Sequence, residues 1–165
     1  MTTLPASTKR IITDLQSHGI EPILYGSQGV SLYIGAFKQF GDIDLLIDDS
    51  WLSQDWDELL RIMQTFGFLL HDIHEHKFVS TEDIHVGFAS NNILVRDGIT
   101  DRLEDVITIL GVDDIAVRTL KPEAFKKAYE FSQKDGYRQA ARGKKDGEVL
   151  ILIIDYLKQN PSSAD

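Results

Sequence analysis

The sequence predicts an α/β or α+β domain in which a mixed sheet is flanked by helices. Short apolar runs bounded by glycine and polar turns alternate with segments whose apolar residues recur at helical spacing. After residue 120 the strand pattern stops and only helical segments follow. We therefore expect a sheet domain over residues 1–120 and a C-terminal helical region over residues 121–165, packed on it as one compact unit.

The expected helices follow capping residues and carry apolar stripes. Ser7 or Thr8 caps the first helix, and Gly19 stands where a left-handed C-cap residue is expected. Pro122 suits the first turn of a later helix, and Gly136 interrupts the pattern that follows it. The expected helices cover about residues 8–18, 26–35, 52–66, 122–134 and 146–158, with one or two further helical turns over 137–143.

The expected strands are short apolar runs between turn residues. They cover residues 22–25, 42–47, 68–79, 84–89, 106–110 and 115–120, with a short one at 93–95. Residues 80–83 would join the third and fourth of them as a hairpin. The last helix contains an almost continuous apolar run over 149–154, which must be buried.

The composition is that of an ordinary soluble globular protein, with 42% apolar and 26% charged residues in 165. The chain has no cysteine, which excludes disulfides and thiolate metal sites. Its net charge of −9 argues against broad nucleic-acid binding, although basic residues gather between Lys121 and Lys145, and it favours a small substrate. No apolar run reaches membrane-spanning length and no signal-peptide core is present, so we expect a cytoplasmic protein without a membrane partner.

The most informative stretch runs from residue 23 to 48, ILYGSQGVSLYIGAFKQFGDIDLLID. Its first strand breaks at Gly26-Ser27, where a helix begins. A small-residue turn at a helix start offers unpaired backbone N–H groups and a partial positive charge, which suits a phosphate. Gly26 allows close approach of the backbone and Ser27 adds a hydroxyl donor, so both are candidate phosphate-binding residues.

The same stretch ends in a strand that carries Asp42 and Asp44. Alternate residues of a strand share a face, which places these two carboxylates about 7 Å apart. Like charges at that distance repel each other unless a cation lies between them. Mg²⁺ prefers carboxylate and phosphate oxygens, so Asp42 and Asp44 are its candidate ligands, beside a triphosphate held at Gly26 and Ser27.

Gly26-Ser27, a helix and then Asp42-x-Asp44 together resemble the signature of the nucleotidyltransferase superfamily. By pattern the similarity is to the small bacterial transferases, which include antibiotic-modifying enzymes and abortive-infection toxins. The resemblance implies a mixed minimal sheet flanked by helices, with Asp42 and Asp44 as catalytic metal ligands. It implies transfer of NMP from an NTP to a hydroxyl-type acceptor with Mg²⁺, where the acceptor is a small molecule, an RNA or a protein.

A second group of residues near the C-terminus also resembles this family. Pro122-Glu123 at a helix start, Arg142, and Lys145-Asp146 before an apolar helix follow the order seen in family members. The resemblance implies that Lys145 pairs with the nucleotide phosphates and that the neighbouring acid fixes its position. Without the resemblance, these residues read as a solvated loop between helices.

The sequence departs from the family at a third carboxylate, which members generally carry on a neighbouring strand. It would fall near Gly87, within residues 84–89. Glu82, Asp83 or a residue from another strand would have to replace it, and His85 or His76 could serve as base. Two interpretations stay open: a one-metal or weakly active enzyme, and a catalytically inactive binding protein, for example within a toxin–antitoxin pair.

Four of the five histidines lie between His71 and His85. On the expected strands His74 and His76 would share a face, and the hairpin would bring His85 close to them. Three such side chains can hold zinc, so a zinc site is a further hypothesis. Histidines exposed on a hairpin are an equally simple interpretation.

Overall fold

Seven strands form one mixed sheet in the computed structural model, which describes residues 4–35, 41–134 and 136–161. The strands are β1 (Ile23–Leu24), β2 (Ile43–Ile47), β3 (Phe68–Asp72), β4 (Lys77–Ser80), β5 (His85–Ser90), β6 (Ile107–Val112) and β7 (Ile115–Leu120). Their order across the sheet is β3-β4-β5-β2-β1-β7-β6. Strand β2 pairs with β5, and β1 with β7, in parallel, whereas the other neighbours are antiparallel.

Strand β2 has side chains of different character on its two faces. Ile43, Leu45 and Ile47 are buried on one face, within the larger of two hydrophobic clusters. Leu46 points the other way, into the second cluster. Because successive side chains of a strand alternate between faces, Asp44 shares a face with Leu46 and is directed away from the larger cluster.

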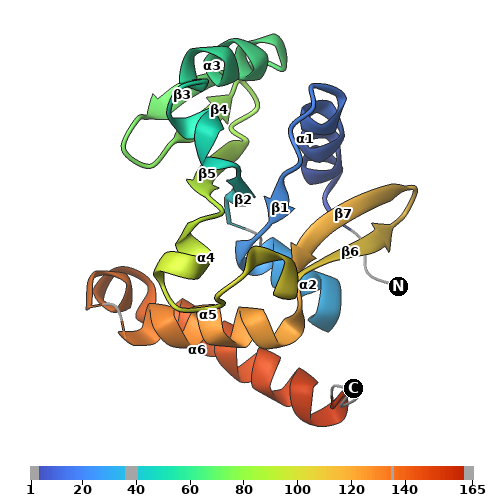
Figure 1. The fold of residues 1–165 in the computed structure, drawn as a ribbon, viewed down its shortest axis with the longest axis vertical. Coiled ribbons are helices and arrows are strands. Elements are labelled where there is room, and N and C mark those ends of the chain that lie inside the picture. Colours follow the sequence, from blue (N-terminus) through green and yellow to red (C-terminus); the bar gives the residue numbers. More distant parts are fainter. Residues whose placement is uncertain (1–3, 36–40, 135, 162–165) are drawn as a thin grey trace.

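Helices α1 (Ala6–Ser17) and α3 (Trp56–Thr65) cover the larger cluster. Figure 1 shows both on the same side of the central strands. Their apolar side chains recur at helical spacing and are buried: Ile11, Ile12 and Leu15 on α1, and Leu59, Ile62 and Met63 on α3. A 3-10 helix, η1 (Asp49–Leu52), precedes α3. Gly19 follows α1 with φ +77°, so the predicted left-handed residue is confirmed.

The second cluster lies among α2 (Gly26–Ile34), α5 (Pro122–Lys134) and α6 (Gly136–Gln159). The three helices contribute Val30, Phe125 and Ile153 to this cluster, and the sheet contributes Ile23 and Leu46. The short helices α4 (Ile93–Arg96) and η2 (Leu103–Asp105) lie at its edge. Helices α5 and α6 thus pack on the side of the sheet that carries Asp44, opposite α1 and α3 (Figure 1).

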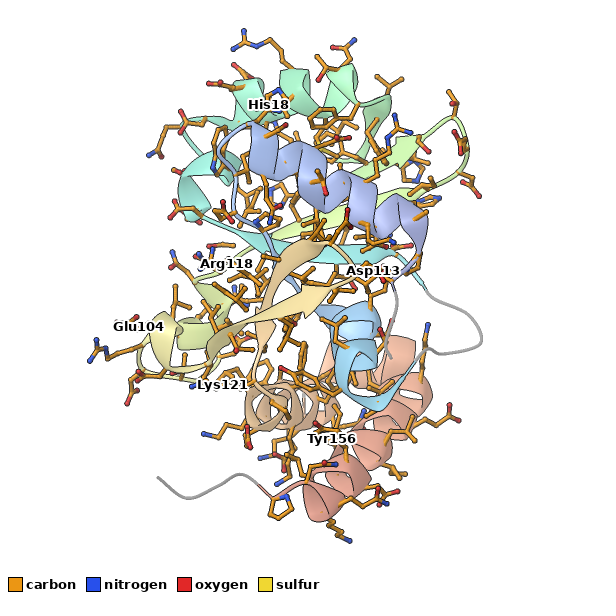
Figure 2. All side chains as sticks on the ribbon, turned by 90° about the vertical axis from the view of Figure 1, so that its right-hand side faces the viewer. His18, Glu104, Asp113, Arg118, Lys121 and Tyr156 are labelled. Carbon is orange, nitrogen blue, oxygen red and sulfur yellow. The ribbon has the colours of Figure 1, made fainter. Side chains whose placement is uncertain are left out.

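The β6–β7 hairpin is tied to α1 by an ion pair. Lys9 Nζ donates to Asp113 Oδ2 at 2.6 Å, and Asp113 lies in the tight turn between the two strands (Figure 2). Asp113 has φ +54°, a left-handed conformation that aspartate tolerates better than most residues. The carboxylate of Asp113 raises the pKa of Lys9, so Lys9 is a cation at neutral pH.

Two of the expected strands are wrong. Residues 68–79 form two strands, β3 and β4, with a turn at 73–76. Asp72 Oδ1 accepts hydrogen bonds from the main-chain N–H groups of His74 and Glu75, which closes this turn locally. Residues 93–95 lie in the one-turn helix α4, where Leu94 is fully buried.

Helix α6 also differs from expectation, because it runs without a break from Gly136. Its apolar run is only partly buried: Ile153 is in the core, whereas Ile151 and Leu152 are 60% and 43% exposed. A helix turns about 100° per residue, so a continuous apolar run cannot face the core throughout. No helix in the described ranges has both the length and the apolar character needed to cross a bilayer.

Candidate functional site

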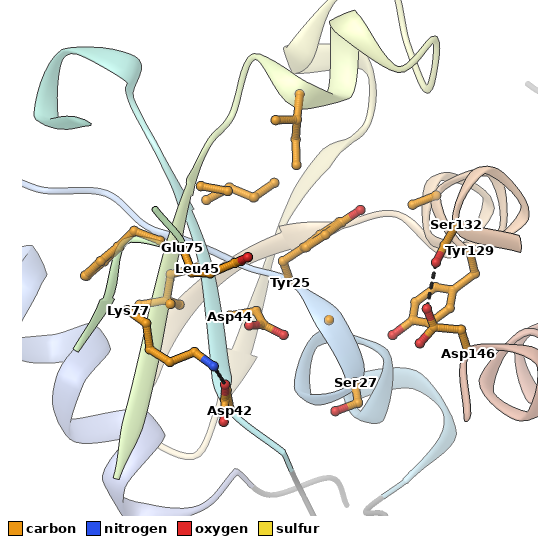
Figure 3. A pocket seen from close by; sticks show the side chains of 17 residues that line it. Tyr25, Ser27, Asp42, Asp44, Leu45, Glu75, Lys77, Tyr129, Ser132 and Asp146 are labelled. Carbon is orange, nitrogen blue, oxygen red and sulfur yellow. Dashed lines mark hydrogen bonds and ion pairs between the residues drawn. The ribbon is translucent and has the colours of Figure 1, made fainter. Parts of the chain in front are cut away.

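Asp42 directly precedes β2 and Asp44 is its second residue, where the strand enters the sheet between β5 and β1. Both line a pocket of about 260 Å³ together with Gly26 and Ser27. Four of the residues singled out from the sequence are therefore brought to one place, on two consecutive elements (Figure 3). The pairing of β1 with β2 fixes the position of the α2 start relative to Asp44, because Tyr25 N donates to the main-chain oxygen of Asp44 at 2.9 Å.

The turn at Gly26 can be made only by glycine. Its φ of +63° lies in the left-handed region, and a Cβ at this position would lie 2.5 Å from Asp44 Oδ2. The start of α2 therefore approaches the Asp44 carboxylate more closely than any other residue would allow. The first backbone N–H groups of an α-helix have no acceptor within the helix, so this turn presents donors beside the acid.

Helix α2 is held in place by buried contacts on both sides. The Thr8 hydroxyl of α1 donates to Gln28 Oε1, and both side chains are buried. At Gly29 a Cβ would lie 2.6 Å from Phe125 Cζ and 2.8 Å from the Leu24 oxygen. These contacts fix the orientation of the helix start relative to β2.

The opposite wall of the pocket comes from α5 and α6. Tyr129 and Ser132 of α5 and Asp146 of α6 line it (Figure 3). Asp146 is only 3% exposed, and Ser132 Oγ donates to its Oδ2 at 2.6 Å. The pocket thus closes between the sheet and helices α5 and α6, and residues on its two sides, such as Gly26 and Asp146, are more than 100 positions apart in the sequence.

Lys145 lies at the edge of this site and does not contribute to the wall of the pocket, to which the next residue, Asp146, belongs. Lys145 is exposed, and its Nζ would lie 3.5 Å from a Cβ at Gly41, the residue before Asp42. Its ammonium is therefore near the acid pair in space. The side chain of Arg142, which the sequence placed in the same group, lies outside the described part of the chain.

Two charged residues that sequence reasoning missed also line the pocket, Glu75 and Lys77. Lys77 Nζ forms an ion pair with Asp42 Oδ2 at 2.7 Å (Figure 3). This hydrogen bond raises the pKa of Lys77, and the charges of Asp44 and Glu75 add to the effect, so Lys77 is a cation at neutral pH. The signal in the sequence that could have revealed them is Asp72, whose side chain stabilises the turn between β3 and β4. This turn brings Glu75 and Lys77 to the site.

Gly87 occupies the position expected for a third carboxylate, directly beside Asp44. The two residues are register partners between β5 and β2, and a Cβ at Gly87 would lie 3.6 Å from Asp44 Oδ1. Of the proposed replacements, Glu82 lines a separate pocket near α1. Asp83 and His85 form a 2.9 Å pair in a neighbouring cavity of about 330 Å³ that also reaches Asp42.

The histidine cluster does not take the expected arrangement. His74 and His76 lie in the β3–β4 turn and do not share a strand face, and His76 packs against Trp56 with 5.3 Å between ring centroids. His71 and His85 are neighbours, at 5.8 Å. Within the described residues no three His, Cys, Asp or Glu side chains are arranged to hold a metal ion by themselves, so the structure gives the zinc hypothesis no support.

No protein-family model matches the chain. It is 31% identical over 142 residues to the uncharacterized protein YnaI of Bacillus subtilis (strain 168), a match that covers 86% of this chain and 88% of YnaI. The chain belongs to the YnaI family.

Two solved structures have the same fold as this chain. The chain is similar to the lincomycin-bound lincosamide antibiotic adenylyltransferase LnuA, with a TM-score of 0.62 and 15% identity over 94% of this chain and 99% of LnuA. It is also similar to an antigenic nucleotidyltransferase-like protein from Paracoccidioides brasiliensis, with a TM-score of 0.61 and 17% identity over 92% of this chain and 78% of that one. The predicted nucleotidyltransferase fold is confirmed.

Proposed function

We propose that this protein transfers a nucleoside monophosphate from an NTP to an acceptor, with Mg²⁺ held by Asp42 and Asp44. The observation that carries the proposal is that both carboxylates share one pocket with the start of α2. Carboxylate oxygens are donors that Mg²⁺ prefers, and a helix start is suited to phosphate. The nucleotidyltransferase fold supports nucleotidyl transfer as the general activity.

The described residues contain no group of three protein ligands for a metal ion, and a Mg²⁺ site of the proposed kind does not need one. Mg²⁺ is commonly bound by one or two carboxylates together with substrate phosphates. In this proposal Asp42 and Asp44 supply the protein ligands and the triphosphate supplies the others. Bound there, the ion would polarise the phosphates and offset charge on the leaving group.

In the reaction an acceptor oxygen forms a bond to the α-phosphorus of the NTP. The bond from that phosphorus to the oxygen bridging to the β-phosphate breaks, and pyrophosphate leaves with the electron pair. The Gly26 backbone and the Ser27 hydroxyl would hold the terminal phosphates, and Lys145 would approach them from the edge of the site. The acceptor proton must pass to a base, for which Glu75 is the carboxylate brought into the pocket by the β3–β4 turn.

The acceptor is open among a small molecule, an RNA and a protein. LnuA is a lincosamide antibiotic adenylyltransferase with lincomycin bound, which makes lincosamides one class worth testing. The second cavity beside Asp42, lined by Asp83 and His85, offers a place from which an acceptor could reach the acid pair. An Asp–His pair there is also able to accept the acceptor proton.

The alternative function is that of a catalytically inactive nucleotidyltransferase-fold binding protein, for example within a toxin–antitoxin pair. Gly87 favours it, because this position beside Asp44 carries no side chain. Such a protein would still bind Mg²⁺–NTP at Asp42 and Asp44 but would release no pyrophosphate.

The test is to incubate the purified protein with each NTP, labelled at the α-phosphate, in Mg²⁺. The acceptors are tRNA, an aminoglycoside, a lincosamide and the protein itself. Transfer of label by the wild type and its loss in Asp44→Asn supports the enzyme, with Asp57→Asn on the exposed side of α3 as the matched control. Nucleotide binding without transfer to any acceptor supports the inactive alternative, and no nucleotide binding overturns both.

A further inference from the structure

Lys77, Gly87 and Asp44 form one row across three neighbouring strands. Lys77 of β4 pairs in register with Gly87 of β5, and Gly87 pairs with Asp44 of β2. Register partners project on the same face of a sheet, so Lys77 and Asp44 share a face with only a glycine between them. The absence of a side chain at Gly87 leaves room for the lysine to reach over β5.

The lysine uses that space to contact the acid pair. Its Nζ lies 2.7 Å from Asp42 Oδ2, and it attracts Asp44 and Glu75 electrostatically. The charged side chains described in the wall of the pocket are four carboxylates and this single ammonium: Asp42, Asp44, Glu75, Asp146 and Lys77. One fixed cation is therefore placed among several acids, on an oxygen that a metal ion would also use.

We propose that Lys77 is a built-in cation of this site, which takes the place of a second divalent ion. Two-metal sites need a pair of ions about 4 Å apart, bridged by shared carboxylates. An ammonium on Asp42 occupies one of the two positions and repels a divalent ion from it. The site then takes one divalent ion with the nucleotide.

This inference rests on the proposed metal site, and it specifies how many ions that site holds. It makes a clear prediction for removal of the charge. In Lys77→Met the acids keep their places without the competing ammonium, so the chain alone should bind Mn²⁺ about tenfold more tightly or better, as expected for removing a like charge close to the ion.

The chain offers a well-matched control. Lys9 forms an ion pair with Asp113 at 2.6 Å, and its side chain is 31% exposed, as is that of Lys77. Lys9→Met therefore removes an equivalent ion pair outside the pocket and should leave Mn²⁺ binding unchanged. Lys77→Arg keeps the charge and should bind Mn²⁺ as the wild type does. Lys77→Gln is a second uncharged variant, which should show the tighter binding expected of Lys77→Met and can replace it if the methionine variant fails to fold.

The measurement is a titration with Mn²⁺ followed by electron paramagnetic resonance, which counts free ions, first without nucleotide and then with α,β-methylene NTPs. We expect one Mn²⁺ per bound nucleotide in the wild type, and tighter binding with a second ion in Lys77→Met. Two ions in the wild type, or equal affinities in the wild type and both uncharged variants, would overturn the inference. Failure of the nucleotide to bind would instead count against the proposed function, while the affinities measured without nucleotide would still test Lys77.

Discussion

Gly26 and Asp44 pack so closely that a Cβ on the glycine would lie 2.5 Å from Asp44 Oδ2. The contact joins the start of α2 to the acid pair, which are the two halves of the proposed site. It also explains the local sequence, because the turn needs φ +63° as well as a residue without a side chain.

Replacing Gly26 with alanine should therefore damage both stability and binding. We expect a loss of about 1–3 kcal/mol from the left-handed backbone, and at least a tenfold loss of Mg²⁺–NTP affinity as Asp44 is displaced. Gly19→Ala is the matched control, since Gly19 has φ +77° but its Cβ would meet nothing within 4 Å. Equal loss of affinity in the two variants, measured by calorimetric titration, would show that the close contact has no part in binding.

Lys145→Ala should weaken NTP binding without affecting the fold. An exposed ammonium near the acid pair that contacts phosphate contributes a charge-assisted hydrogen bond, so we expect about a five- to tenfold weaker affinity. Lys158→Ala, an exposed lysine in the last turn of the same helix, should have no effect. If both variants bind as the wild type does, Lys145 is not a nucleotide ligand.

Thr8→Val should destabilise the protein because it leaves the buried side chain of Gln28 without a hydrogen-bond donor. Thr8 and Gln28 are 0% and 3% exposed, and their side chains are hydrogen-bonded to each other. Valine has the same shape but no hydroxyl, so the buried Gln28 carbonyl loses its donor at a cost of about 1–3 kcal/mol. Urea unfolding measures this cost, and Thr13→Val on the same helix is the control, because Thr13 is exposed and its hydroxyl donates to the main-chain oxygen of Lys9.

Much of the site follows from local sequence, and the remainder depends on distant contacts. The Gly26 turn and the alternation around Asp42 and Asp44 are properties of short segments, so their geometry could be predicted. The β3–β4 turn was missed because residues 68–79 resemble one long strand, and Asp72 ends it through a side-chain hydrogen bond. Lys77 and Glu75 reach the pocket only through that turn.

The wall formed by α5 and α6 could not be predicted for a different reason. Ser132 and Asp146 come to the pocket by packing of helices against the sheet, which pattern alone does not fix. The burial of Asp146 at 3% has no local signature, since Lys145 beside it is exposed. The same limit applies to Ile151, which is apolar but 60% exposed.

Tyr33→Phe should show how burial of a phenol links stability to pH. The Tyr33 hydroxyl donates to the Leu120 oxygen at 2.7 Å, and burial, followed by the charges of Tyr156 and Glu123, raises its pKa. At neutral pH we expect the wild type to be more stable by about 1 kcal/mol, the value of the hydrogen bond.

The sign of the pH effect follows from the raised pKa. Above about pH 10 the unfolded chain loses the Tyr33 proton while the folded chain keeps it, so the wild type loses stability that the phenylalanine variant does not lose. The difference in free energy of unfolding between the two proteins should therefore shrink as the pH rises from about 9 to about 11, across the pKa of an unfolded tyrosine. A difference that stays constant in urea titrations over this range would contradict the assignment.

The proposed metal site is tested most directly by calorimetric titration of Asp44→Asn with each NTP in Mg²⁺ and in EDTA. Asparagine preserves the shape of the side chain but removes the charge that holds the cation. We expect metal-dependent NTP binding to disappear while thermal unfolding remains close to that of the wild type. Unchanged Mg²⁺-dependent affinity in a folded Asp44→Asn protein would contradict the role proposed for the acid pair.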